Sequence, residues 1–492
     1  MVEKLNNELH EYHGWMAFDE EYFNSEEFQE VLESYEAAEA AGETPMMDAD
    51  DLVDLADYYT WQGDEERTTD IIEQGLQFYP DHALLNVFMA RRALMDNDFD
   101  EAQHYADNIT DTDAPDYHYL RAEILIAQGR IDEADSYLRN YGLTVPADEY
   151  GDFVKDVANL YVDYDVNEKA YEWMLRMTGD DSDDFKELMA RALFGIGKYK
   201  DSERIFNELI DSHPYSKHYW NSLASVQLMN EDYSNAITSS EYAIAIDPSD
   251  PDGFCSKANG LFRLGNFEEA RKYYQRYTEL VPDDEFGLLH QGVCLVNLGR
   301  NEEALKILEH ALAITPEDSP FLLQIYQELA FCYSSLHQLD KALEMLQHTD
   351  TMDTDHNDAY VIKGHILLQN GRIEEAEEAF KEAIMLSDNS PSVLLRIIVS
   401  LYDNHYVNAC YQMLMKFLEF VQAYYPDFHN GYAYMALCCY DLSKTEDFMK
   451  YLRLAVKENP QEAQSVLNCL FPDGTPVSEY VSYMEQRLPQ NP

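Results

Sequence analysis

One short stretch, "GIGK" at residues 195–198, has the Gly-Lys pair with which a P-loop binds phosphate. A P-loop also needs Ser or Thr after the lysine and a glycine five residues before the second one. Here Tyr199 follows the lysine, and no glycine lies five residues before Gly197. We therefore interpret "GIGK" as a turn between two helices and predict no nucleotide site.

Two other groups of residues could bind metal ions. "DTDHND", residues 353–358, begins like a calcium loop, but Asp358 replaces the glycine at position six and Gly364 replaces the glutamate at position twelve. His10 and His13 have a spacing that zinc ligands use, yet no third ligand lies near them in sequence. We interpret these residues as a linker and as surface histidines, and we predict no metal and no cofactor.

The charge and the cysteines limit the possible partners and location. The chain has 34 Lys plus Arg against 94 Asp plus Glu, a formal net charge of -60, which repels nucleic acid and anionic membranes. It has no long apolar run and no apolar core of a signal peptide at its N-terminus. The seven cysteines are an odd number without a CxxC pair, which favours a reducing cytoplasm. The charge has two interpretations, solubility or attraction of a basic partner.

The sequence repeats with a period near 34 residues, which indicates a repeat architecture. Twelve units begin at Ala49, Ala83, Pro115, Gly151, Asp183, Lys217, Pro251, Glu285, Leu323, Asn357, Pro391 and His429. Position eight is Ala or Gly in every unit but one, which has Ile398, and position twenty is mostly Ala, Ser or Thr. Large apolar residues stand at positions eleven and twenty-four, as in Leu193 with Phe206. The pattern predicts pairs of helices that pack small residues against large ones.

This pattern resembles the tetratricopeptide repeat (TPR). The unit that begins at Lys217 matches it with Trp220, Leu223, Ala224, Ala236, Ala243 and Pro248. The resemblance covers residues 49–462 and implies an all-α fold, a right-handed α-solenoid of antiparallel helix pairs. The unit from Pro391 departs most, with Ile398, Cys410 and Phe417 where small residues belong, so we expect a distortion there. Residues 1–48 and 463–492 are predicted to cap the array with helices, because a solenoid needs atypical ends.

In the TPR family, positions two, five, six, nine, twelve and thirteen of the first helix line the inner face of the superhelix. The resemblance therefore implies a partner-binding strip of apolar residues on this face. We call it the predicted strip: Leu228, Met229, Phe262, Leu289, Val293, Val296, Phe331, Val361, Leu368, Leu395 and Val399. A contiguous apolar surface favours a partner site, but partial burial against the next unit would explain position twelve equally well.

Some TPR domains bind acidic C-terminal peptides through a clamp of five basic and amide residues. Lys155 and Asn159 match two of its positions, whereas Leu188, His218 and Ser222 do not match the other three. We therefore do not predict this clamp. Our hypothesis is a non-enzymatic, cytoplasmic scaffold or adaptor that binds a protein or peptide on its inner face. The alternative is an acidic shield or nucleic-acid mimic that holds a basic protein by charge; the sequence does not indicate the oligomeric state.

Overall fold

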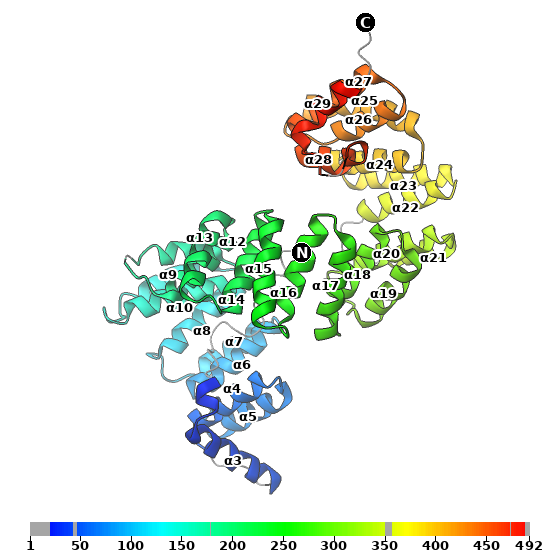
Figure 1. Ribbon diagram of the computed structural model, residues 1–492. Helices are drawn as coiled ribbons and strands as arrows, with labels where there is room; N and C mark the ends of the chain where they lie inside the picture. The colour runs from blue at the N-terminus through cyan, green and yellow to red at the C-terminus, as the bar shows by residue number, and fades with distance from the viewer. Residues whose placement is uncertain (1–19, 43–46, 178, 350–356, 473, 488–492) are drawn as a thin grey trace. The chain divides into compact units, whose positions relative to one another are not determined.

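The computed structural model describes residues 20–42, 47–177, 179–349, 357–472 and 474–487, and these residues form helices and no strand (Figure 1). The predicted all-α fold of consecutive helix pairs, an α-solenoid, is confirmed. The chain divides into two compact units, Met1–Asp247 and Pro248–Pro492, and each is described by itself.

The described residues of unit 1 form two N-terminal helices and six helix pairs. The N-terminal helices are α2 (Glu20–Phe23) and α3 (Glu26–Ala40). The pairs are α4 (Ala49–Trp61) with α5 (Glu65–Phe78), α6 (Ala83–Met95) with α7 (Phe99–Asn108), α8 (Pro115–Ala127) with α9 (Ile131–Tyr141), α10 (Tyr150–Asp163) with α11 (Asn167–Met174), α12 (Asp183–Gly195) with α13 (Tyr199–Ser212), and α14 (Lys217–Met229) with α15 (Tyr233–Ile246).

Within its described residues, unit 2 has six further pairs and a C-terminal group. The pairs are α16 (Pro251–Arg263) with α17 (Phe267–Leu280), α18 (Glu285–Asn297) with α19 (Asn301–Ile314), α20 (Leu322–Ser335) with α21 (Leu339–Thr349), α22 (Asn357–Gln369) with α23 (Ile373–Leu386), α24 (Pro391–Asp403) with α25 (Val407–Tyr424), and α26 (Tyr432–Asp441) with α27 (Thr445–Glu458). The C-terminal group is α28 (Pro460–Leu467), the 3-10 turns η1 (Asn468–Leu470) and η2 (Val477–Glu479), and α29 (Tyr480–Arg487).

Close approach of the two helices in a pair depends on the small residue at position eight. Ala224, Ala258 and Ala330 at this position are fully buried. A Cβ atom added to Gly292 would lie 2.5 Å from Leu308, and one added to Gly364 would overlap the ring of Phe380. Leu308 and Phe380 stand at position twenty-four of their own units, so the small residue of one helix receives the large residue of its partner.

The N-terminal helix α3 is fixed by a side-chain cap. Ser25 precedes α3, and its Oγ accepts a hydrogen bond of 3.2 Å from the backbone N–H of Phe28. Phe28, Leu32 and Tyr35 are buried against the first pair. The assignment of residues 1–48 and 463–492 as caps stays a prediction, since residues 1–19, 43–46 and 488–492 lie outside the described part.

The departure from the repeat pattern after Pro391 has a structural counterpart. Helix α25 has 18 residues, four more than the 14 of α23, and α26 begins at Tyr432, three residues after the predicted unit start at His429. Gly431 precedes α26 with a φ of 103°, a value that favours glycine. The carboxylate of Glu462 from α28 accepts hydrogen bonds of 2.8 and 3.0 Å from the N–H of Gly431. A residue far along the sequence therefore caps α26, which a local pattern does not reveal.

Candidate partner-binding site

The predicted strip lies on first helices in both units. Leu228 and Met229 are on α14 of unit 1, and the other nine residues are on α16, α18, α20, α22 and α24 of unit 2. Burial divides them into two groups. The buried group, exposed by less than a tenth, is Leu289, Val293, Val361, Leu368 and Leu395. The half-buried group is Leu228, Met229, Phe262, Val296, Phe331 and Val399.

The buried group serves the core of the chain. Val361 and Leu368 of α22 pack with Phe380 of α23 and Ile397 of α24 in one apolar cluster. The half-buried residues of unit 2 are Phe262, Val296, Phe331 and Val399, which we call the half-buried strip. Phe262 and Val296 stand at position twelve and Phe331 and Val399 at position nine of their units, whereas Val293 and Leu368 at the same two positions of other units are buried. The sequence pattern could not separate the two groups because both are apolar and share a helix face.

The two phenylalanines of this strip each contact a histidine of a neighbouring first helix. The Phe262 ring of α16 lies 6.1 Å from the ring of His290 on α18, at 76°. The Phe331 ring of α20 lies 5.6 Å from the ring of His365 on α22, at 62°. Sequence reasoning missed both histidines, because we searched histidines only for metal ligands.

Both histidines are uncharged near neutral pH. Burial lowers the pKa of His290 to about 4, against a weaker opposing effect from its hydrogen bond to Phe286. Its Nδ1–H donates to the Phe286 carbonyl oxygen at 2.9 Å, which leaves Nε2 as an acceptor. Burial also lowers the pKa of His365. The neighbourhood of the half-buried strip therefore gains no positive charge from these rings.

Glu328 is an acidic residue on the same face as Phe331. The two residues stand three apart on α20, a spacing that places side chains next to each other on a helix. Glu328 is half-buried, and burial alone raises the pKa of its carboxyl to about 7. Among the described residues, none donates a hydrogen bond to the Glu328 carboxyl or forms an ion pair with it. Its neighbour Gln327 has a buried Nε2 that likewise lacks a partner within the described part of the chain.

Unit 1 has a different first-helix face, with polar side chains at position nine of five consecutive units. We call them the position-nine ladder: Asp57, Arg91, Glu123, Asn159 and Arg191. Arg91 on α6 donates through Nε to both carboxylate oxygens of Glu123 on α8, at 3.0 and 3.3 Å. Arg191 on α12 donates to the side-chain amide oxygen Oδ1 of Asn159 on α10 at 3.1 Å. The ladder thus joins neighbouring repeats through charged hydrogen bonds.

Burial raises the pKa of two carboxyls in this region, Asp57 of the ladder and Asp163 beside it. Burial raises the pKa of Asp57 to about 7; the charge of Asp54 adds to this effect and that of Arg91 opposes it. Burial raises the pKa of Asp163 to about 6, although Arg191 donates to it at 3.2 Å. The two residues that match the clamp for acidic C-terminal peptides have partners within the chain. Lys155 forms an ion pair of 2.9 Å with Asp152, and Asn159 belongs to the ladder.

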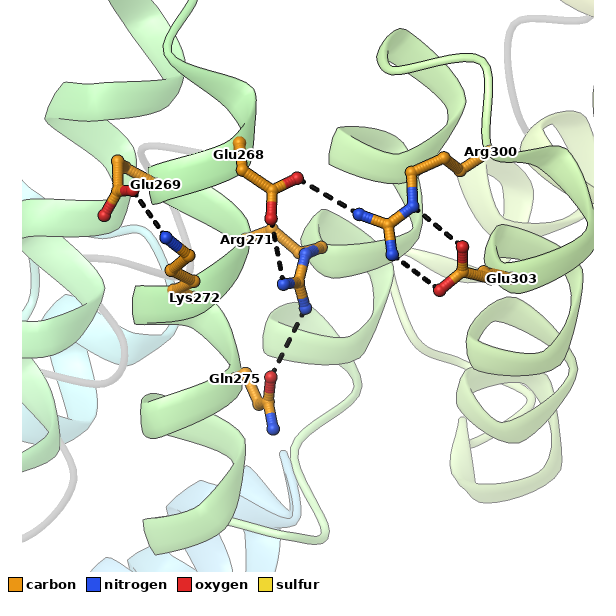
Figure 2. Close-up of polar contacts among 7 residues, drawn as sticks. All are labelled: Glu268, Glu269, Arg271, Lys272, Gln275, Arg300 and Glu303. Carbon is orange, nitrogen blue, oxygen red and sulfur yellow. Dashed lines mark hydrogen bonds and ion pairs between the residues drawn. The ribbon is translucent and has the colours of Figure 1, made fainter.

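The second helices of unit 2 carry a network of ion pairs (Figure 2). Glu268 on α17 accepts from Arg271 of its own helix at 3.2 Å and from Arg300, which precedes α19, at 3.1 Å. Arg300 also donates to both carboxylate oxygens of Glu303, at 2.8 and 2.6 Å. Figure 2 shows each charged group turned to an opposite charge, so the network serves to join α17 to α19. Exposed pairs of this kind stabilise only weakly.

The stretches that resemble nucleotide or metal sites in the sequence were compared with the structure where it describes them. Gly195 ends α12 and Lys198 precedes α13, so the interpretation of "GIGK" as a turn is confirmed. No group of three or more His, Cys, Asp or Glu side chains in the described residues is arranged to bind a metal. His10 and His13 lie outside the described residues, as do residues 353–356.

The buried cysteines have unreactive thiols. Burial raises the pKa of Cys294 and of Cys332 to about 12. Cys410 and Cys438 are both fully buried, and their sulfur atoms lie 3.5 Å apart. A thiol with a raised pKa has little thiolate at neutral pH, so it is a weak nucleophile. These cysteines fill small core positions. No helix within the described residues is long and apolar enough to span a membrane.

Family models match most of the array. Models described as tetratricopeptide repeat match residues 284–349, and residues 89–141 with 188–251. The helix pairs at these residues have the small-against-large packing of the repeat. The chain is a tetratricopeptide repeat protein. Two further models match parts of the array: anaphase-promoting complex, cyclosome, subunit 3, at residues 229–311, and tetratricopeptide repeat protein 21 second ARM domain, at residues 329–468. TPR family membership supports a role in protein interaction.

Solved TPR structures resemble this chain at low identity. The APC/C hetero-tetramer Cut9-Hcn1 has 14% identity over 91% of this chain and 93% of that chain, with a TM-score of 0.35. YrrB, a TPR protein with an unusual peptide-binding site, has 18% identity over 38% of this chain and 95% of that chain, at 0.33. A thermophilic TPR protein from Thermus thermophilus has 21% identity over 38% of this chain and 100% of that chain, at 0.31. Likenesses of this size say nothing about a partner. No curated protein matches the chain.

Proposed function

We propose that this TPR protein is a non-enzymatic, cytoplasmic scaffold or adaptor that binds a protein or peptide on the first-helix face of its array. The observation that carries the proposal is the half-buried strip of unit 2. Phe262, Val296, Phe331 and Val399 keep apolar surface accessible at position twelve of α16 and α18 and at position nine of α20 and α24. Apolar surface that recurs on the same face of several first helices suits an extended or helical peptide.

The two phenylalanines are the expected anchors of the interaction. Complete burial of one such ring contributes roughly 1.5 to 3 kcal/mol, and binding energy concentrates in a few buried aromatic residues. The double variant Phe262→Ser with Phe331→Ser should therefore weaken partner capture by a factor on the order of a hundred, at unchanged helix content.

A control double variant removes apolar surface elsewhere in unit 2 that is more exposed than the two phenylalanine rings. Met385 and Leu386 on α23 are 64% and 54% exposed, so Met385→Ser with Leu386→Ser should leave capture unchanged. Both double variants would be compared with the natural chain in pull-downs and by circular dichroism. Full capture by the phenylalanine variant would count against the proposal.

The net charge of -60 favours a second candidate, an acidic shield that holds a basic protein by charge. Charge-led binding weakens steeply with ionic strength, whereas apolar binding does not. The same pull-downs at low and high salt distinguish the two candidates. Loss of capture at high salt in the natural chain, together with undiminished capture by the phenylalanine variant at low salt, would favour the shield.

A further inference from the structure

An acidic side chain lies inside the face that we propose as the partner site. Glu328 and Phe331 are three residues apart on α20, and the Phe331 ring contacts His365 on α22. The first helices α18 and α22 both pack against α20, and Val293, Val296 and Val361 are apolar residues of these two helices. A carboxylate in such surroundings keeps little of its hydration, and nothing in the described part of the chain donates to it. Its hydrogen-bonding capacity is therefore available to a ligand.

We propose that the carboxylate of Glu328 binds a lysine or arginine side chain of the partner, with the apolar residues that flank this cation packed on the half-buried strip. The inference rests on the proposed function and names the chemistry of its ligand. A cation both donates hydrogen bonds to the carboxylate and neutralises it, which a neutral donor does not do. An acidic side chain of the partner does not suit this site, because it would be repelled by the carboxylate of Glu328 and by a chain with a net charge of -60.

The histidines beside the half-buried strip leave the Glu328 carboxylate available to a cation of the partner. His290 and His365 are uncharged near neutral pH, because burial lowers the pKa of each ring. They therefore do not compete as cations for Glu328. The first-helix face of unit 2 thus combines apolar surface with the half-buried carboxyl of Glu328, and a basic residue flanked by apolar ones complements both.

The test uses synthetic peptide arrays and the full chain. The probes are nine-residue peptides with mixed Leu, Phe, Ala and Ser positions around a fixed central residue, which is lysine, arginine, norleucine or glutamate. Norleucine keeps the length of the lysine side chain without its charge. The natural chain should be retained about tenfold more by central lysine or arginine than by norleucine, and least by glutamate.

Two variants with the same change of net charge separate the site from the overall field. Glu328→Gln should remove the preference for a central cation. Glu377→Gln, at an exposed position of α23, should keep it. A preference that is equal in the two variants overturns the inference, because overall charge would then explain it. Circular dichroism and thermal melts of both variants check that each remains folded.

A third variant separates this inference from the proposed function. Phe331→Ser should reduce retention on every array, whatever the central residue. If it does and Glu328→Gln keeps the cation preference, only the assignment of Glu328 fails. If Phe331→Ser is retained like the natural chain, the proposed site fails and the inference with it. Absence of retention on all arrays overturns both.

Discussion

Replacement of Glu328 by glutamine should stabilise unit 2, and the gain should grow with pH. Burial raises the pKa of this carboxyl from its ordinary value of 4.5 to about 7 in the folded chain. A carboxyl with a higher pKa when folded holds its proton more tightly in the folded state. Its ionisation therefore costs folded-state stability as the pH rises from about 4.5 toward 7, and the cost is complete above 7.

The size of the effect follows from the two pKa values. The free-energy cost of the ionised group is about 1.4 kcal/mol at pH 5.5 and about 3.4 kcal/mol at pH 8, a difference of about 2 kcal/mol. Glu328 is half-buried, so solvent screening reduces this difference to about 1 kcal/mol. The chain would lose its solubility near its isoelectric point of 4.3, so the lower pH of the comparison, 5.5, stays above that value.

The assay compares the thermal melts of the natural chain, Glu328→Gln and Glu377→Gln at pH 5.5 and pH 8. Glutamine cannot ionise, so its cost of burial is the same at both pH values. The stability of Glu328→Gln relative to the natural chain should therefore increase between pH 5.5 and pH 8. Glu377 is exposed on α23, so its variant should follow the natural chain at both. If Glu328→Gln loses stability by the same amount at both pH values, the carboxyl has a partner in the folded chain, and our account of the site is wrong.

Three further predictions concern the fold. Gly364→Ala should destabilise unit 2 by roughly 1–3 kcal/mol because its Cβ would overlap Phe380, and adding Phe380→Leu should recover part of the loss in denaturant unfolding. Deletion of one interior unit, Glu285–Asp318, should leave a folded, shorter array, since contacts join nearest neighbours; an unfolded product in circular dichroism would contradict the solenoid. Glu462→Ala should cost about 1–3 kcal/mol and speed hydrogen exchange at the amide of Gly431, which loses its acceptor; unchanged exchange would refute this cap.

The repeat pattern predicted most of the architecture from local chemistry. The first helix of each described pair begins at the predicted unit start or one residue before it, except in the last pair. The small residue at position eight is a local signal, because it must accommodate a large residue of the same helix pair, as Gly364 accommodates Phe380. The start of α26 was three residues off because its cap, Glu462, lies about thirty residues further along the sequence.

The candidate site was predicted less completely. Helix position placed Phe262 and Phe331 on the first-helix face but could not distinguish them from Leu289 and Val361, which are buried. That difference depends on how far the next helix covers each position, which a repeat register does not contain. Glu328 was missed because a single glutamate in a chain with 94 acidic residues has no sequence signal of its own. What distinguishes it is that no described residue forms a hydrogen bond or ion pair with it, a property of three-dimensional packing.

The position-nine ladder of unit 1 bears on how such an array can change in evolution. Each polar residue there is matched to a particular neighbour, as Arg91 is to Glu123 and Arg191 is to Asn159. Tandem duplication of the repeat that contains Arg91 would bring two arginines against each other at one step, and loss of the repeat that contains Glu123 would leave Arg91 beside Asn159. These repeats therefore cannot change order without loss of their matched polar contacts. The apolar positions of unit 2 do not depend on one particular neighbour and are closer to interchangeable.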